Sequence, residues 1–444
     1  MGNDLLERTP TLLGSLQERV QALLDDSPEW LARLRRAGAD THAALGIPTT
    51  KHEEWKYTSV RGLVEAGPWS PAPQGSVTQA QLQPWTFPGL EQTLVVLVNG
   101  RYAPQLSRLG GEAAVDVQPL IDAVGDTPEL ATKVDAATDV ANHTFAGLNS
   151  ALFEGGTFLR IRKNQRAARP IHVLHVATEG GASFPRLLVV SEEGSDASLI
   201  ESYASVGEAA GFTDAVTEVY VASNAHLEHI KVQRENAESF HIALTGVRQA
   251  PDSAYNGYSV TFGGALTRND LNVYLAGSNI HSRMDGVYAL NGDQVCDNHT
   301  RLDHAFPHCD SFEVYKGVLD GRSKGVFNGK IFVHQDAQKT DAKQTNQALL
   351  LSPHASIDTK PQLEIFADDV KCTHGATVGQ LREDAMFYLR SRGIPFSEAE
   401  ALLVYAFASE VLEKITVAEV RTELEQELFR KLAGAKDAAP APTA

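Results

Sequence analysis

The sequence predicts a mainly β protein whose core is a long series of short strands, with helical segments at both ends. Between residues 151 and 380, alternating runs such as TFLRIRK, IHVLHVA, RLLVVSEEG and GKIFVHQD follow one another, separated by Gly, Asn and Asp. Before and after this region, apolar residues recur at spacings of three and four, which is the period of an amphipathic helix.

Residues 1–85 are predicted to form an N-terminal helical domain with a linker. The helical period runs from about Leu5 to Leu45 and stops before Pro48, and a Pro- and Gln-rich linker is expected from Pro68 to Pro84. Residues 86–150 read as a mixed α/β connecting region, in which the apolar run LVVLV ends in an Asn-Gly turn.

The strand series from 151 to 380 is compatible with a sandwich, a barrel or a parallel β-helix. Two-residue hairpin signals are scarce, and Gly or Asn lies within or at the bend of many runs, as in NGYSVTFGGALTRNDLNVYLAGSN. This pattern suits coils that turn repeatedly in one sense, although no strict repeat length is visible. A β-helix is therefore favoured, and the other two architectures stay open at this point.

Residues 381–434 are predicted to form a C-terminal helical domain. Ser397 and Thr416 each stand three residues before a glutamate, which is the pattern of a capping box at a helix start, so two helices are expected. The tail 435–444, AKDAAPAPTA, has nothing to bury and is expected to be disordered.

The composition limits the classes of partner and the compartment. The formal charge of -17 disfavours nucleic acid and anionic lipid, and no apolar stretch approaches the length of a membrane span. Three cysteines, Cys296, Cys309 and Cys372, are too few for a disulfide framework in 444 residues. A soluble, cytoplasmic protein is expected.

Cys372 and His374 are the most informative pair of candidate ligands. They are two residues apart on a predicted strand, so their side chains share a face with Cα atoms roughly 7 Å apart. A thiolate and an imidazole can share an iron-sulfur cluster or a soft metal, but a cluster normally needs four ligands. The others would come from elsewhere in the chain or from a partner. The alternative is that Cys372 is a buried small hydrophobic residue and His374 an ordinary hydrogen-bonded residue. Asp368 and Asp369 are nearby, and alternation places only Asp368 on the face of Cys372.

A second group of potential ligands lies in CDNHTRLDHAFPHCDS, between Cys296 and Cys309. The density of Cys, His and Asp residues suggests a zinc site, but their spacing fits no zinc template. Alternating strands with a turn at Pro307 would place the side chains on different faces, so a structural role is favoured. His226, His229 and His241 are read as core or surface histidines. A zinc hydrolase built on His304 and His308 remains an alternative.

Signatures of nucleotide hydrolysis and of other common catalysis are missing from the sequence: it has no G-x-x-x-x-G-K-[ST] loop, nucleophile elbow, H-E-x-x-H or dinucleotide fingerprint. Any nucleotide hydrolysis would have to come from another polypeptide. The alternative from another class is a β-helical carbohydrate-active enzyme using Asp270, Asp285 and Asp297, although their spacing does not compel it.

The pieces KGVFNGKI, AQKTDAKQTNQALLLS, TKPQLEIFADDVKCTHGATVG and FYLRSRGI together resemble the SufB/SufD family of iron-sulfur cluster assembly, and KHEEWKYTS resembles its SufD branch. The resemblance implies a right-handed parallel β-helix between helical end domains. It also implies a non-catalytic scaffold that pairs with SufB through the end of its β-helix and docks a SufC ATPase, with sulfide arriving from a cysteine desulfurase system. A homodimer is possible for the isolated chain.

The resemblance also assigns roles to individual residues. His374 matches the family position proposed to help hold the nascent cluster at the SufB/SufD interface, and Cys372 matches the nearby interface thiol. The cluster would be transient and shared with SufB, with none held tightly by the isolated chain. For SufC docking the resemblance points to Phe387, Arg392, Gly393 and Ile394, backed by the helix from Ser397 to Val411.

Overall fold

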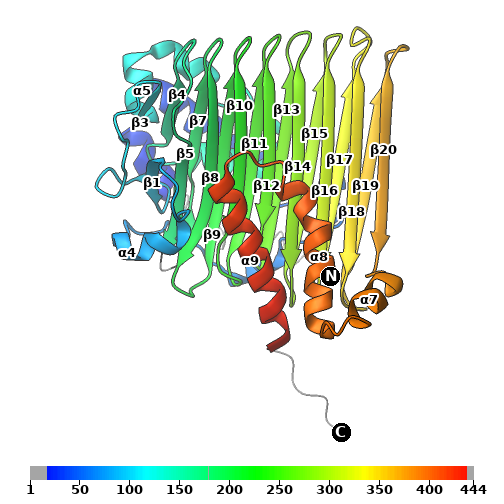
Figure 1. Cartoon of the computed structure of the whole chain (residues 1–444). Helices are drawn as coiled ribbons and strands as arrows, with labels where there is room; N and C mark the ends of the chain where they lie inside the picture. The colour runs from blue at the N-terminus through cyan, green and yellow to red at the C-terminus, as the bar shows by residue number, and fades with distance from the viewer. Residues whose placement is uncertain (1–17, 179, 438–444) are drawn as a thin grey trace.

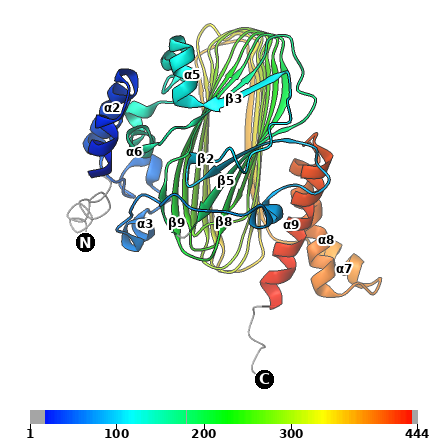
Figure 2. The ribbon, with the colours of Figure 1, turned by 90° about the vertical axis from the view of Figure 1, so that its left-hand side faces the viewer.

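The computed structural model, which describes residues 18–178 and 180–437, is built on two long sheets that face each other (Figures 1 and 2). We call them the front sheet and the back sheet. The front sheet contains, in order, β2 (Arg101–Tyr102), β1 (Thr93–Val98), β5 (Ile171–Thr178), β8 (Asp196–Val206), β10 (His226–Arg234), β12 (Ala254–Thr261), β14 (His281–Leu290), β16 (Asp310–Leu319), β18 (Asp341–Leu350) and β20 (Lys371–Gly379). The back sheet contains β3 (Val115–Pro119), β4 (Thr157–Ile161), β7 (Arg186–Ser191), β9 (Gly211–Val221), β11 (Phe240–Gln249), β13 (Leu266–Leu275), β15 (Val295–His304), β17 (Lys324–Val333) and β19 (Ser356–Ile365), with β6 (Gly181–Ser183) beside β9.

The chain alternates between the two sheets, so each strand from β7 to β18 pairs in parallel with the strand one coil earlier and the strand one coil later. The register carries one position from coil to coil: Met284 pairs with Glu313, Glu313 with Gln344, and Gln344 with His374. Paired positions of a parallel ladder project to the same face, so these side chains form a stack. The predicted parallel β-helix is confirmed, and the sandwich and the barrel are excluded.

Antiparallel strands and helices close the first coil. β2 pairs antiparallel with β1, and β3 pairs antiparallel with β4. The helices of this end are α2 (Glu29–Leu45), α3 (Arg61–Ala66), α4 (Gln79–Leu82), α5 (Leu120–Asp126) and α6 (Thr144–Leu152). Residues 18–25 are also helical, and the helical region breaks before Pro28; the part of the predicted helix in 1–17 lies outside the described residues.

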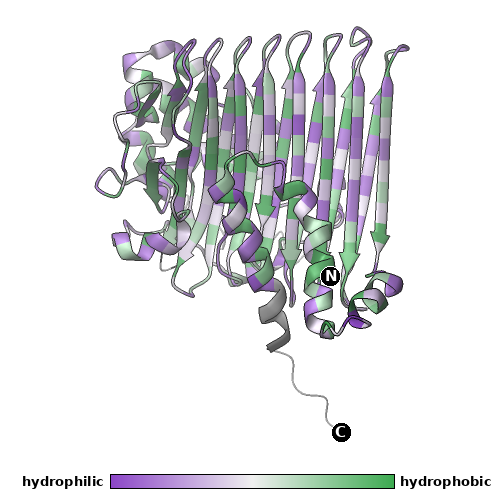
Figure 3. Ribbon diagram, in the orientation of Figure 1, coloured by the Kyte–Doolittle hydropathy of each residue, from purple (hydrophilic) through white to green (hydrophobic). Residues whose placement is uncertain are grey.

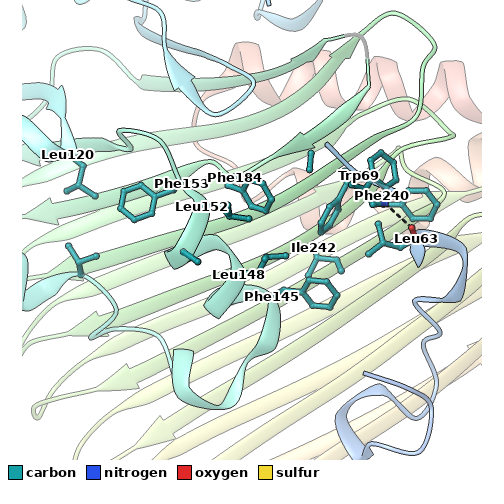
Figure 4. Packing of buried hydrophobic residues seen from close by; sticks show 14 of the residues in the cluster. Leu63, Trp69, Leu120, Phe145, Leu148, Leu152, Phe153, Phe184, Phe240 and Ile242 are labelled. Atoms are coloured by element: carbon teal, nitrogen blue, oxygen red, sulfur yellow. Dashed lines mark hydrogen bonds between the residues drawn. The ribbon is translucent and has the colours of Figure 1, made fainter. Parts of the chain in front are cut away.

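The N-terminal helices cover the back sheet through an aromatic-rich core (Figure 4). Phe145 of α6 contacts Phe212 of β9 with ring centroids 6.1 Å apart, and Trp69 contacts Phe240 of β11 at 6.0 Å. Trp69 is 4% exposed and donates its indole N–H to the Leu63 carbonyl. The expected linker around it is therefore wrong: this stretch packs against the fold.

Helices α2 and α6 cross at glycines. A Cβ on Gly38 of α2 would lie 2.5 Å from the carbonyl oxygen of Gly147 in α6, and a Cβ on Gly147 would lie 2.9 Å from the carbonyl oxygen of Gly38. Backbone atoms on both sides cannot move aside as a flexible side chain can. The two helices thus approach closely only because both positions lack a side chain.

The C-terminal helices are α7 (Glu383–Arg390), α8 (Phe396–Leu412) and α9 (Ala418–Asp437), of which α8 and α9 cover the front sheet (Figures 1 and 2). α7 is one helix more than expected. Both predicted capping boxes are wrong: α8 begins after Pro395 without a side-chain cap, and the Thr416 hydroxyl donates to Glu228. α9 continues to Asp437, into the expected tail, whose residues 438–444 lie outside the described part. Within the ranges the structure describes, no helix is long and apolar enough to cross a membrane.

The interior between the sheets carries a polar layer. Glu201 accepts a hydrogen bond from the Thr217 hydroxyl and lies 2.8 Å from Nε2 of His229. The Lys231 ammonium donates to Asn269 at 2.7 Å, and burial lowers the pKa of Lys231 to about 8. The strands near β5 and β8 are mostly hydrophobic, whereas those from β16 to β20 are banded with hydrophilic residues (Figure 3).

Glu313 of β16 is the interior carboxyl nearest the last coils. It is 2% exposed, its Oε2 accepts a hydrogen bond of 2.7 Å from Nε2 of Gln344, and burial raises its pKa to about 7. No cation is among the groups that shift this pKa. The folded protein therefore holds the proton of Glu313 at pH values where the unfolded chain loses it.

We predict that Gly38→Ala destabilises the protein by about 1–3 kcal/mol, because the new methyl group meets backbone at the α2–α6 crossing. Gly125→Ala in α5 is the matched control, since a Cβ there has no atom within 4 Å and should leave the stability within about 1 kcal/mol of wild type. Thermal and denaturant unfolding measure both variants. Equal stabilities for the two would contradict the close crossing.

We predict that Glu313→Gln changes how stability depends on pH. The folded-state pKa of this carboxyl is raised, so its full contribution is present below the unfolded pKa near 4.5 and is lost as pH rises through about 7. Relative to wild type, the Gln variant should gain about 3 kcal/mol between pH 4.5 and pH 8, measured by denaturant unfolding with chelator present. The exposed Glu238→Gln is the control, and a difference independent of pH for Glu313→Gln would contradict this.

Candidate functional site

The last coil leaves both sheets with an open edge. β20 ends the front sheet and β19 ends the back sheet, and within residues 18–178 and 180–437 neither has a strand on its outer side (Figure 1). Residues on β20 are mostly exposed and those on β19 mostly half-buried, whereas every second residue of β18 from Ala342 to Ala348 is buried. The free N–H and C=O groups of such an edge can pair with another strand.

Cys372 and His374 lie on β20 and face the interior side of the ladder. Cys372 pairs with Ala342 and His374 pairs with Gln344, and both partners are buried inside the solenoid at 0% and 1% exposure. The prediction that the two side chains share a face is confirmed by this register. Because no further coil covers them, His374 is exposed and Cys372 is half-buried.

The surroundings of Cys372 favour the thiol over the thiolate. Its side chain packs against the small apolar cluster formed by Ile331, Val333 and Ala342, and burial raises its pKa above the usual value. A thiolate would therefore require a metal ion or a positive group brought to the open edge. The pair can supply one soft and one borderline ligand, and the remaining ligands of a cluster must come from another surface.

Asp368 and Asp369 are not part of this arrangement. Both lie in the turn between β19 and β20, so the alternation that placed Asp368 on the Cys372 face does not apply. Asp369 binds the Lys339 ammonium, and its backbone N–H donates to the Gln338 side chain at 2.9 Å. These contacts fix the turn that leads into β20.

The residues between Cys296 and Cys309 are scattered, as the turn at Pro307 predicts. Cys296 and His304 face the interior, where Nε2 of His304 lies 2.9 Å from the Ser311 hydroxyl, whereas His299 faces outward. Cys309, in the turn between β15 and β16, donates its S–H to the carbonyl of Gly277 in the turn between β13 and β14. Within the described ranges, no group of three or more His, Cys, Asp and Glu side chains is arranged to hold a metal.

The aspartates of the carbohydrate-active alternative do not line one groove. Asp270 and Asp297 lie on the outer face of the back sheet, where both bind Arg268. Asp285 lies on the outer face of the front sheet, where its buried carboxylate binds Lys414 at 3.0 Å. Glycoside cleavage requires two carboxylates beside one bond. Asp285 lies on the opposite face from the other two, and the carboxylates of Asp270 and Asp297 are held by Arg268.

Of the predicted docking residues, Phe387 lines an open groove at the base of the last coils, and Arg392, Gly393 and Ile394 follow in the turn after α7. The groove has a volume of about 730 Å³, lies between residues 350–353 and helices α7 and α8, and is lined partly by Phe387 and Phe396. Phe387 is 74% exposed, and the Arg392 guanidinium lies 3.5 Å from the centre of the Tyr388 ring. Gly393 has φ +83°, which lets the chain leave α7 and turn back into α8. Exposed aromatic groups of this size are typical of protein interfaces.

Helices α8 and α9 are tied to the front sheet by buried polar contacts as well as by apolar packing. Lys414, in the turn between them, reaches Asp285 of β14, and its carbonyl accepts a hydrogen bond of 3.0 Å from the Tyr258 hydroxyl of β12. The Thr416 N–H donates to Glu228 of β10 at 2.7 Å. The helices are therefore fastened to three neighbouring strands of the sheet that ends in β20.

Sequence reasoning missed the interior polar residues behind the open edge, above all Glu313, Gln344 and Asn346. A signal existed, since Gln344 and Asn346 alternate within AKQTNQA and so share a face. That face is the interior only once the register of β18 is known.

Two family models cover most of the chain: one described as "SUF system FeS cluster assembly, SufBD core domain" matches residues 174–407, and one described as "SufBD protein N-terminal region" matches residues 9–173. The chain is 35% identical over 395 residues to the iron-sulfur cluster assembly protein SufD of Escherichia coli (strain K12), which covers 88% of this chain and 90% of that protein. It is 26% identical over 417 residues to the iron-sulfur cluster assembly protein SufD of Bacillus subtilis (strain 168), covering 91% and 94%. The chain therefore belongs to the SufBD family of the SUF iron-sulfur cluster assembly system.

Proposed function

We propose that this chain is a non-catalytic, cytoplasmic scaffold subunit that pairs through its last coil with a SufB-type partner and carries a SufC-type ATPase on its C-terminal helices. The observation that carries this proposal is the open edge of β19 and β20, where β20 presents Cys372 and His374 beside main-chain groups that no described strand pairs. Strand addition at such an edge would give one continuous sheet across two chains. A second copy of this chain could occupy the edge when the partner is absent.

We call the proposed junction between β19 and β20 and the partner the seam. At the seam, the His374 imidazole would help to hold the nascent cluster, and the partner would supply the opposite ligands. The cluster is cargo in this scheme, shared between the subunits and passed on. Exposure makes His374 available for ligation, whereas the half-buried Cys372 thiol would ionise only when a metal arrives. Sulfide would come from a cysteine desulfurase system.

ATP hydrolysis would supply motion from outside this chain. A SufC-type ATPase docked at the surface of Phe387, Arg392, Gly393 and Ile394 would pull on α7 and α8 when two such subunits close. The contacts of Lys414 and Thr416 to the front sheet then provide a route for strain to reach the ladder that ends in β20. Opening the seam would give iron and sulfide access to the ligands.

We predict that His374→Ala lowers cluster formation on the reconstituted complex with SufB and SufC homologues by about tenfold, because one ligand is lost. Thr373→Ala is the matched control, since Thr373 lies on the same strand but faces outward, paired with exposed Lys343. The visible absorbance of the cluster and its iron content measure the yield. An unchanged yield in His374→Ala would remove this residue from the assigned role.

We predict that Phe387→Ala weakens binding of the SufC homologue about 30-fold, equivalent to about 2 kcal/mol, because an exposed aromatic anchor is lost. Phe306→Ala, which removes another exposed aromatic from a turn of the β-helix, should bind like wild type. Calorimetric titration of the full chain measures both. If the chain binds neither SufB nor SufC homologues, the scaffold function itself is wrong.

A further inference from the structure

The interior of the last coils contains a group of buried oxygens that the fold does not satisfy. Oε1 of Glu313, Oε1 of Gln344 and Oδ1 of Asn346 have no hydrogen-bond partner among the described residues. All three side chains are buried, at 2%, 1% and 1% exposure. Buried polar atoms without partners are uncommon, so three on adjacent strands point to an occupant that supplies what the protein does not.

These residues occupy neighbouring interior positions, and we call this part of the interior the chamber. Glu313, Gln344 and His374 are stacked on three successive front-sheet strands, and Asn346 lies two positions from Gln344 on the same face. From the back sheet, the Thr300 hydroxyl is close enough to influence the Glu313 carboxyl without meeting hydrogen-bond geometry. Thr300 is stacked below Gly329. A Cβ on Gly329 would overlap the Gln344 carboxamide, so this glycine provides the room.

The negative partial charge of these unsatisfied oxygens determines which kind of ligand they can bind. Once Glu313 is ionised, its carboxylate oxygens and the carboxamide oxygens only accept hydrogen bonds or bind cations, and no lysine or arginine is among the groups that act on Glu313. The Thr300 hydroxyl could donate one hydrogen bond to an anion such as sulfide, but the acceptor oxygens of Glu313, Gln344 and Asn346 would repel it. Oxygen ligands with one carboxylate suit a hard or borderline divalent cation.

We propose that the chamber behind His374 binds a divalent metal cation, held by the Glu313 carboxylate and the carboxamide oxygens of Gln344 and Asn346. This inference rests on the proposed function only in identifying the cation as iron on its way to the cluster. The entrance would be the open face of the last coil, where the stack of Glu313 and Gln344 ends at the exposed His374. The cation is held before the cluster ligands take it, so the chamber is distinct from the seam itself.

The test uses the full chain alone with Mn²⁺ as an oxygen-seeking spin probe, titrated by electron paramagnetic resonance at pH 7.5. We expect saturable binding of one Mn²⁺ that Glu313→Gln weakens by at least about tenfold. Glu364→Gln removes an outward-facing carboxylate at the same end of the solenoid and should leave the affinity unchanged. Competition by Fe²⁺ under anaerobic conditions then connects the site to iron.

A second variant distinguishes loss of metal binding from a folding defect in Glu313→Gln. Gln344→Glu adds a carboxylate to the chamber and should tighten Mn²⁺ binding at least about tenfold, an outcome that a purely structural role for Gln344 would not produce. His374→Ala should keep the Mn²⁺ site, because the imidazole belongs to the seam. Absence of saturable binding, or equal affinities in wild type, Glu313→Gln and Gln344→Glu, would overturn the proposal and leave hydration as the role of the chamber. Binding of SufB and SufC homologues is not measured in this experiment, so its failure is distinct from failure of the scaffold function.

Discussion

In a parallel β-helix, the main-chain hydrogen bonds of each coil run to the coil before it and the coil after it, so a coil is complete only with a neighbour on both sides. At the first coil, the antiparallel strands β2 and β3 and the helices around Trp69 supply that neighbour. At the last coil, no described strand does so. This asymmetry between the ends positions Cys372 and His374, because the interior face of β20 becomes a surface only when no further coil covers it.

The interior is polar in the early coils as well as at the open end. In the early coils, an apolar cluster that includes Val173 and Leu199 lies between the sheets together with the buried pair of Glu201 and His229. Toward the open end, Glu313, Gln344 and Asn346 each have a buried oxygen without a partner among the described residues. A hydrophobic interior at an open end would favour nonspecific association, whereas a polar interior demands a partner or ligand of matching chemistry.

Alternation within strands is a local property, so it was sufficient for a mainly β core and for the placement of Cys372 and His374 on one face. The choice of a β-helix over a sandwich or a barrel depended on the family resemblance. Local pattern was insufficient wherever tertiary contacts override it. Thr416 has the spacing of a capping residue, yet its hydroxyl binds Glu228, which is 188 residues away. The Pro-rich stretch around Trp69 has the composition of a linker, yet burial of the indole holds it against Phe240. The role of Glu313 depended on the register, which composition does not encode.

The two surfaces with the strongest claim to function belong to one sheet. β20 lies three places from β14 in the front sheet, and β14 is the strand whose Asp285 holds Lys414 between α8 and α9. Displacing the helices would load β10, β12 and β14 directly, and each ladder transmits that load to the next strand through its hydrogen bonds. The back sheet, by contrast, is covered by the N-terminal helices. Motion from the C-terminal helices would thus tilt one sheet against the other, and the open end, where no further coil ties the two together, is where that displacement would be largest.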